Sequence, residues 1–224
     1  MSHTHNRNRP LTGLFLAVLL ALYAGPAHAA TNMPPLETFI EQVQNGDAAT
    51  VRGIYAPGLF ADAVAQQPHD DPAFVSSEED TVTQFGLAAS HGSIGLLAHN
   101  SLAGQNFFAL RAGQIFLLIY GDGSRTAFRV TRLLRARALN PESIRSNFID
   151  LDTGHFLTAA RLFDSVYDQP GRLILQTCIE AEGDPSWGRL FVIAEPYAEG
   201  DPGQPLLFEA EARGYGSILN LATF

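Results

Sequence analysis

Residues 114–134, QIFLLIYGDGSRTAFRVTRLL, carry the clearest structural signal in the chain. Two runs rich in branched and aromatic residues flank the dipeptide Asp122-Gly123. An Asp-Gly pair suits a two-residue type I′ turn, because both turn positions need a positive φ. The sequence therefore predicts an antiparallel β-hairpin made of residues 114–120 and 126–134.

Similar runs occur on both sides of this hairpin. Each is short, rich in branched or aromatic residues and bounded by glycines, which is typical of strands in an all-β domain. They cover residues 82–88, 94–98, 172–178 and 189–196, and we expect a ten-residue connection, 179–188, between the last two. The pattern predicts a mainly β fold: a mostly antiparallel barrel or half-open sandwich with short helices in its loops.

Other segments have helical or irregular patterns. Apolar residues at helical spacing predict an amphipathic helix that begins near Leu36 and ends near Gly46, and a helical piece over 156–167 with Leu157, Leu162 and Val166 toward the core. The stretch 53–80 contains three prolines and ends in acids. We expect an extended or loop-rich entry to the main domain there, with Phe60 and Phe74 pinned to its surface.

The first 29 residues have the pattern of a secretory signal. Arg7 and Arg9 precede an apolar run, residues 11–24, which is followed by the small-residue motif Ala27-His28-Ala29. The run is shorter than the roughly 20 residues that span a bilayer as a helix. We expect cleavage near Ala29, a secreted or extracytoplasmic mature protein, and no stable membrane anchor.

The rest of the chain suits one compact domain. We expect an N-terminal helix and extended segment over 30–80, the main barrel over 81–200, and a tail or edge strand over 201–224. The formal net charge is −9, and all 14 basic residues are arginine. This negative balance argues against nucleic acid or an anionic membrane as the main partner.

The chain has one cysteine, Cys178. Cysteines of exported proteins usually form disulfide pairs, so an unpaired one is buried, cross-linked between chains or used chemically. Cys178 ends one predicted strand and Arg189 begins the next, so a hairpin would bring them together at one rim of the sheet. A guanidinium beside a thiol favours the thiolate and supplies hydrogen-bond donors to a developing oxyanion.

A thiol nucleophile also needs a group that takes and returns protons, usually histidine. Behind the leader the candidates are His69, His91, His99 and His155. His99 directly follows the predicted strand 94–98, so a sheet edge would hold it while its ring stays accessible. Among these candidates, position favours His99 as the proton carrier, although a lone histidine after a strand is more often a structural residue.

These residues lie in strings that resemble the sortase family of cysteine transpeptidases. LILQTC, 173–178, is similar to the signature in which a Leu, a variable residue and Thr precede the catalytic Cys. IGLLAHNSLAGQNFFALRAGQIFLLI, 94–119, resembles the segment in which the catalytic His is followed by Phe-Phe-x-Leu, a Gly and a strand. WGRLFVIAEP, 187–196, resembles the closing strand that begins with the essential Arg. The resemblance covers residues 81–196, about half of the chain.

The resemblance implies an eight-stranded mixed β-barrel and a reaction in two halves. Cys178 would form a thioacyl enzyme with a C-terminal sorting-motif peptide of an exported protein, and an amine from the cell wall or another protein would displace it. His99 would exchange the protons, and Arg189 would stabilise the tetrahedral states. Thr177 and Trp187 are the candidate substrate-binding residues, although Trp187 could instead cap the apolar rim. No cofactor is expected.

Other interpretations of the same residues stay open. A lone Cys at the end of a strand is more often packing than nucleophile. The same site could hydrolyse peptides, or the barrel could bind peptides without catalysis. L,D-transpeptidases fit less well, because their motif keeps His-Gly near the Cys. Asp150 and Asp152 leave a calcium site open as an alternative to a cofactor-free protein.

Overall fold

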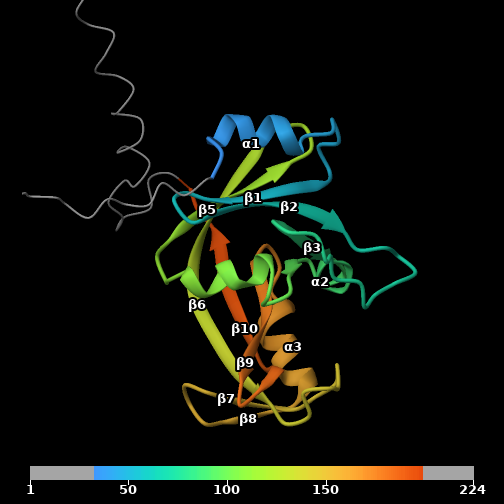
Figure 1. Ribbon diagram of the computed structural model, residues 1–224, viewed down its shortest axis with the longest axis vertical. Helices are drawn as coiled ribbons and strands as arrows, with labels where there is room; N and C mark the ends of the chain where they lie inside the picture. Colours follow the sequence, from blue (N-terminus) through green and yellow to red (C-terminus); the bar gives the residue numbers. More distant parts are fainter. Residues whose placement is uncertain (1–32, 199–224) are drawn as a thin grey trace, which may run out of the picture. The chain divides into compact units, whose positions relative to one another are not determined.

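The computed structural model describes residues 33–198. The predicted leader and C-terminal tail lie outside the described residues, and none of the helices described has both the length and the apolar character to cross a membrane. The elements, shown in Figure 1, are α1 (Leu36–Val43), β1 (Val51–Ala56), β2 (Phe60–Gln66), β3 (Thr81–Phe85), α2 (Gly86–Ser90), β4 (Ile94–Leu97), the 3₁₀ helix η1 (Ala103–Ala109), β5 (Ile115–Tyr120), β6 (Arg125–Ala138), β7 (Phe148–Asp150), β8 (Phe156–Leu157), α3 (Ala159–Tyr167), β9 (Leu173–Ala181) and β10 (Asp184–Pro196).

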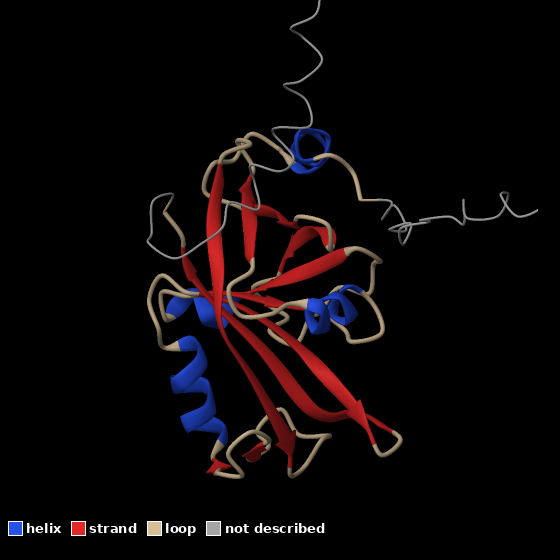
Figure 2. Ribbon diagram, turned by 90° about the vertical axis from the view of Figure 1, so that its left-hand side faces the viewer, coloured by secondary structure: helices blue, strands red, loops and turns tan. Residues whose placement is uncertain are grey.

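Eight strands close into a barrel (Figure 2). Hydrogen-bonded neighbours follow the order β10-β9-β4-β3-β2-β1-β5-β6, and β10 also pairs with β6 to complete the ring. β2 pairs with β3, and β4 with β9, in parallel, while the other neighbours are antiparallel. β7 and β8 extend the sheet from β6 outside the ring. The predicted mainly β fold, an eight-stranded mixed barrel with short helices in its loops, is confirmed.

The interior of the barrel is filled by side chains that alternate along each strand, as the period of two requires. On β2, Phe60 and Val64 belong to the inner cluster, whereas Ala61 and Ala63 pack on the outer side, beneath α1. On β5 and β6, Phe116 and Phe128 are register partners whose rings stack with centroids 6.3 Å apart. Alternation on adjacent strands thus produces one continuous core.

Two helices cover the outside of the barrel, as their predicted apolar faces require. The α1 residues Phe39, Ile40 and Val43 pack in one outer cluster with residues of β1 and β5. Gly53 on β1 allows this approach, because a Cβ there would lie 2.8 Å from the Phe39 ring. α3 packs through its own apolar face on β6, β9 and β10, in a second outer cluster.

The first part of the expected extended or loop-rich entry over 53–80 is extended, and it forms two strands of the barrel itself. β1 and β2 form an antiparallel hairpin within the barrel, and Phe60, expected to be pinned to the surface of the main domain, is 4% exposed. The strand signal was weak because β2 contains small alanines on one face and an acid on the other. Such residues favour a strand only through the neighbours they pack against.

The predicted hairpin of residues 114–134 is confirmed, but its turn is not type I′. Only Gly123 of the central pair has a positive φ, +83°, and its N–H donates to the Tyr120 carbonyl at 2.9 Å. The carboxylate of Asp122 instead accepts a hydrogen bond from the backbone N–H of Ser124 at 2.9 Å. The aspartate therefore supports the turn through its side chain rather than by adopting a left-handed backbone.

Asp62 is a buried acid in the barrel wall. It lies between Phe60 and Val64 on β2, so it faces the same side of the strand, and it is 1% exposed. Among residues 33–198, its Oδ2 atom has no hydrogen-bond partner. Burial, helped by the charge of Asp80 and opposed by a hydrogen bond with Asn106, raises the pKa of Asp62 to about 7.

This pKa predicts a pH-dependent loss of stability. An unfolded Asp titrates near 3.9, so its raised folded pKa contributes stability that is complete below about pH 4 and lost as the pH rises through 7. Asp62→Asn removes this dependence. Urea denaturation should show the free energy of unfolding of Asp62→Asn, relative to the unmodified protein, rising by about 2 to 3 kcal/mol from pH 5 to pH 8.

The exposed Asp70 supplies the matched control. Asp70→Asn should leave the difference in unfolding free energy the same at both pH values. An Asp62→Asn difference that does not change with pH would contradict the proposed burial of an uncompensated carboxylate.

Candidate active site

Cys178 and Arg189 are direct register partners on β9 and β10. Partners opposite each other on neighbouring strands point to the same face of the sheet. Ile174 on β9 and Phe191 on β10 belong to the cluster beneath α3, so alternation places Cys178 and Arg189 on that same outer face. Both residues are partly exposed. The hairpin thus brings the predicted thiol and guanidinium residues side by side at the rim of the barrel.

The connection between these strands is shorter than expected. Instead of ten residues, β9 continues to Ala181 and β10 starts at Asp184, with only Glu182 and Gly183 between them. Both turn residues have positive φ, +55° and +79°, which is the geometry of a type I′ turn. The prediction of a ten-residue connection is wrong. Pro185 and Gly188 interrupt the run of branched and aromatic residues that indicates a strand, although β9 and β10 extend through most of this segment.

A bulge in β10 lies directly before Arg189. The register shifts between Asp184 and Gly188, so the three residues 185–187 lie opposite the single residue Glu180 of β9. The Arg189 Nη1 atom donates to the carbonyls of Ser186 and Gly188, each at 2.8 Å. Gly188 itself is required by a close approach of β6, because a Cβ there would lie 2.7 Å from the Ala136 carbonyl oxygen. The bulge and the guanidinium thus hold each other in place.

His99 reaches the same place from β4. The parallel register pairs Leu97 with Gln176, so His99 and Cys178 each lie two residues beyond a paired position. The pairing continues past the strand end, since Ala98 N–H donates to the Gln176 carbonyl at 3.1 Å. His99 is exposed, and it follows Leu97 at the alternation that points toward the outer face.

Thr177 and Gly104 lock the backbone on which His99 sits. The Thr177 hydroxyl donates to the Ala98 carbonyl at 2.9 Å, and Thr177 is 2% exposed. The His99 carbonyl accepts hydrogen bonds from the N–H groups of Leu102 and Gly104, both at 3.0 Å. A Cβ on Gly104 would lie 2.3 Å from the Thr177 hydroxyl oxygen and 2.6 Å from the His99 carbonyl oxygen. The loop after His99 therefore packs directly on the strand that carries Cys178.

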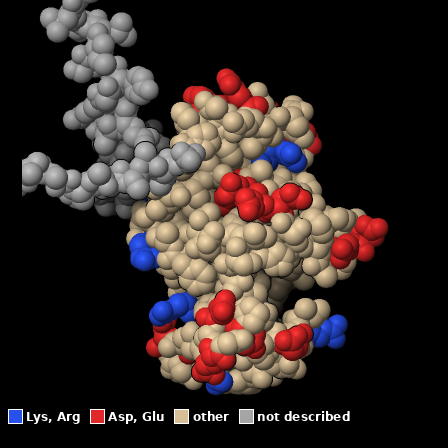
Figure 3. Space-filling model, viewed as in Figure 1, with Lys and Arg blue, Asp and Glu red and all other residues tan. Residues whose placement is uncertain are grey.

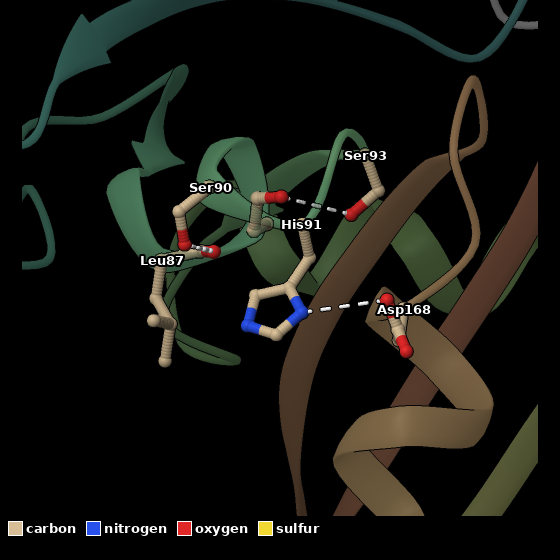
Figure 4. A network of polar contacts seen from close by, with 6 residues as sticks. Leu87, Ser90, His91, Ser93 and Asp168 are labelled. Atoms are coloured by element: carbon tan, nitrogen blue, oxygen red, sulfur yellow. Dashed lines mark hydrogen bonds and ion pairs between the residues drawn. The ribbon is translucent and has the colours of Figure 1, made fainter.

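His91, another of the predicted candidates, lies elsewhere. It follows α2, at the opposite end of β4 from His99, and its Nδ1 atom faces Asp168 Oδ1 at 3.4 Å (Figure 4). Its ring lies edge-on to Phe163 of α3 with centroids 4.9 Å apart. His91 thus joins the turn before β4 to α3, and it is separated from Cys178 by the length of the strand pair.

The remaining predicted residues have distinct surroundings. Trp187 lies in the bulge, partly buried, between the carbonyls that Arg189 contacts. Thr177 points into the barrel, so any influence on a substrate would be indirect, through the backbone at His99. The sequence analysis did not single out Asn100 and Gly104, whose contacts lie with residues distant in sequence.

The carboxylates of Asp150 and Asp152 both have partners within the protein. Asp150 Oδ1 accepts hydrogen bonds from the backbone N–H groups of Asp152 and Thr153, at 2.8 and 3.0 Å. Asp152 forms an ion pair with Arg135 at 2.5 Å. Within the described part of the chain, no group of three or more His, Cys, Asp and Glu residues could hold a metal ion.

The arrangement can support covalent acyl transfer. A thiol and a guanidinium lie on β9 and β10, and an imidazole follows the end of β4, the other neighbour of β9. Groups of these three types serve as nucleophile, donor to negative charge and proton carrier in acyl transfer. Figure 3 shows acidic side chains scattered over the visible face and fewer basic ones, without a continuous basic patch on that face. The view agrees with the negative formal charge.

Comparison with known proteins gives fold likeness only. No protein-family model matches the chain, and no curated protein matches it. The solved structures that it resembles are sortases, the family suggested by the sequence motifs. Sortase C-1 from Actinomyces oris has 16% identity and a TM-score of 0.47, covering 74% of this chain and 82% of that one. Sortase A from Listeria monocytogenes has 14% identity and a TM-score of 0.42, covering 68% of this chain and 89% of that one.

Substitution of Thr177 tests how much the hydrogen bond from its buried hydroxyl to the Ala98 carbonyl contributes to stability. Thr177→Val keeps the shape but leaves the Ala98 carbonyl without its partner, which should lower the free energy of unfolding by about 1 to 3 kcal/mol. Thr177→Ser keeps the hydroxyl and should lose less. Urea denaturation of the two variants measures this, and a loss confined to Thr177→Ser would show that the methyl packing, not the hydrogen bond, matters.

Proposed function

We propose that this chain is a sortase-like cysteine transpeptidase. The observation that carries the proposal is the register of β4, β9 and β10. Arg189 on β10 is the partner of Cys178, and His99 follows the end of β4, on the other side of β9. A buried structural cysteine needs neither neighbour. The partial exposure of Cys178, and its place on a rim instead of in the core, also favour a chemical role.

In the first half of the proposed reaction, the Cys178 sulfur attacks the carbonyl carbon of a substrate peptide bond. The thiol proton passes to His99, and the negative charge moves to the carbonyl oxygen. When the tetrahedral state collapses, the C–N bond breaks, His99 protonates the departing amine, and a thioester remains on Cys178.

In the second half, an acceptor amine attacks the thioester. The C–S bond breaks, the new C–N bond forms, and the proton lost by the amine returns through His99 to the sulfur. The reaction is balanced without a metal or redox cofactor. Water in place of the amine would give hydrolysis from the same intermediate, and the exposure of His99 leaves that path accessible to solvent.

Arg189 would stabilise the oxyanion. Both of its hydrogen bonds within residues 33–198 use Nη1, so Nε and Nη2 of the planar fork remain for a carbonyl oxygen or substrate backbone. Those two bonds fix the guanidinium before substrate arrives, which lowers the reorganisation cost of charge stabilisation. Trp187, in the same bulge, is our candidate for contact with the substrate chain.

The proposed substrate is a sorting-motif peptide near the C-terminus of an exported protein, and the proposed acceptor is an amine of the cell wall or of another protein. These partners follow from the sortase resemblance together with the leader pattern of residues 1–29. We propose an extracytoplasmic site of action for the same reason, and a protein released from the membrane.

A direct test uses the single cysteine of the chain. Mature protein incubated with a library of sorting-motif peptides should gain the mass of an acyl fragment, and Cys178→Ala should gain nothing. His99→Ala should lower the acylation rate by about 100-fold or more, because general acid-base catalysis commonly contributes that much. His155→Ala, an exposed histidine in the β7–β8 connection, is the matched control.

Each outcome of this mass measurement bears on the proposal. Loss of the adduct on addition of amines, with a new amide product, supports transpeptidation, whereas loss in water alone supports hydrolysis. If no peptide labels Cys178 and a small thiol reagent does, the barrel is a peptide-binding module or a structural protein and the enzymatic proposal fails.

Substitution of Arg189 separates charge from geometry. Arg189→Lys keeps a positive charge but loses the planar fork, and we expect kcat for acyl transfer to fall by about 100-fold, as for the removal of one oxyanion donor. Arg161→Ala, at an exposed position on α3, should leave the rate unchanged. A fully active Arg189→Lys would show that only the charge of this residue is needed.

A further inference from the structure

Asn100 connects the two loops that carry the proposed proton carrier and the proposed oxyanion donor. Its Nδ2 atom donates to the carbonyl of Pro185 at 3.2 Å, across 85 positions of sequence. Asn100 directly follows His99, and Pro185 opens the bulge of β10 that precedes Arg189. The contact thus bridges β4 and β10, which are separated in the sheet by β9.

Three carbonyls within residues 185–188 accept hydrogen bonds from two side chains, those of Asn100 and Arg189. The Pro185 carbonyl accepts from Asn100, and the carbonyls of Ser186 and Gly188 accept from the Arg189 guanidinium. Movement of the bulge would therefore displace both Arg189 and the loop after His99. These bonds run across the end of β9 that carries Cys178.

The other restraints on His99 act from one side only. Thr177 holds the Ala98 carbonyl from within the barrel, and the short loop back to Gly104 packs on the same strand. Both fix the backbone before and after His99 relative to β9. Neither fixes it relative to the bulge, and only Asn100 does this among the hydrogen bonds of the described residues.

We infer that Asn100 is a positioning residue that holds the His99 loop against the Arg189 bulge, so that the imidazole and the guanidinium keep a fixed relation to Cys178. This inference rests on the proposed function. It assigns to Asn100 no contact with substrate. Its effect passes through the backbone of His99 on one side and through the Pro185 carbonyl on the other.

The first measurement does not require a substrate. The alkylation rate of Cys178 by iodoacetamide, followed by intact mass from pH 5 to pH 10, reports how the thiol interacts with its neighbours. His99→Ala should change this pH profile. Asn100→Ala should change the profile in the same direction but by a smaller amount. Asn100→Gln, which keeps an amide donor, should lie closer to the unmodified protein.

Asn140→Ala is the matched control, because Asn140 is exposed and its side chain has no hydrogen bond among the described residues. Its alkylation profile and melting temperature should be unchanged. Asn100→Ala should also keep the melting temperature, so that an altered profile reflects position and not unfolding.

The second measurement uses acyl transfer, once a labelling peptide is known. Loss of positioning should lower kcat by about tenfold while KM stays unchanged, because small displacements of a reacting group act on the chemical step. The tenfold loss should be partly recovered in Asn100→Gln.

The outcomes separate the two proposals. If His99→Ala changes the alkylation profile and Asn100→Ala does not, the positioning role is overturned while the proposed function stands. If His99→Ala also leaves the profile unchanged, His99 is not coupled to the thiol, and both proposals fail.

Discussion

The pairing of β10 with two strands at once is the interaction on which the rest of the structure depends. β10 bonds to β9 on one side and to β6 on the other over most of its thirteen residues, and the second pairing closes the ring. Without the pairing of β10 with β6, these two strands would both be edge strands with unpaired backbone groups. Each buried backbone hydrogen bond contributes little alone, but leaving it unmade is costly.

The same pairing determines where the proposed catalytic residues lie. Because β10 is in register with β9, Arg189 is opposite Cys178, and because β9 is parallel to β4, the end of β4 arrives beside the same position. A shift of one residue in either register would turn a side chain to the opposite face. The inner core, which includes Leu175 and Leu190, prevents such a shift by burying the alternate residues of both strands.

The site has a packed neighbour on one side and is open to solvent. On the same outer face of β9, Tyr167 of α3 is buried and donates its hydroxyl to Gln176 at 2.6 Å, which joins the helix to the strand of Cys178. His99 is exposed, and Cys178 and Arg189 are partly exposed. Two close approaches, at Gly104 and Gly188, bring neighbouring backbones nearer than a side chain would permit. A site on such a scaffold keeps its geometry while a peptide binds from solvent.

The sequence by itself determined the β class, the main hairpins, both amphipathic helices and the candidate Cys178, because these depend on local periodicity or on the count of one residue type. The placement of His99 and Arg189 around Cys178 needed only the additional topology of a hairpin and the sortase resemblance. The tertiary structure alone decided the β1–β2 hairpin, the bulge before Arg189, the buried Asp62 and the Asn100–Pro185 contact. These features join residues distant in sequence, or place small and polar residues in strands. The free energy that stabilises these features comes from contacts with residues distant in sequence, and no local sequence pattern encodes which residues those are.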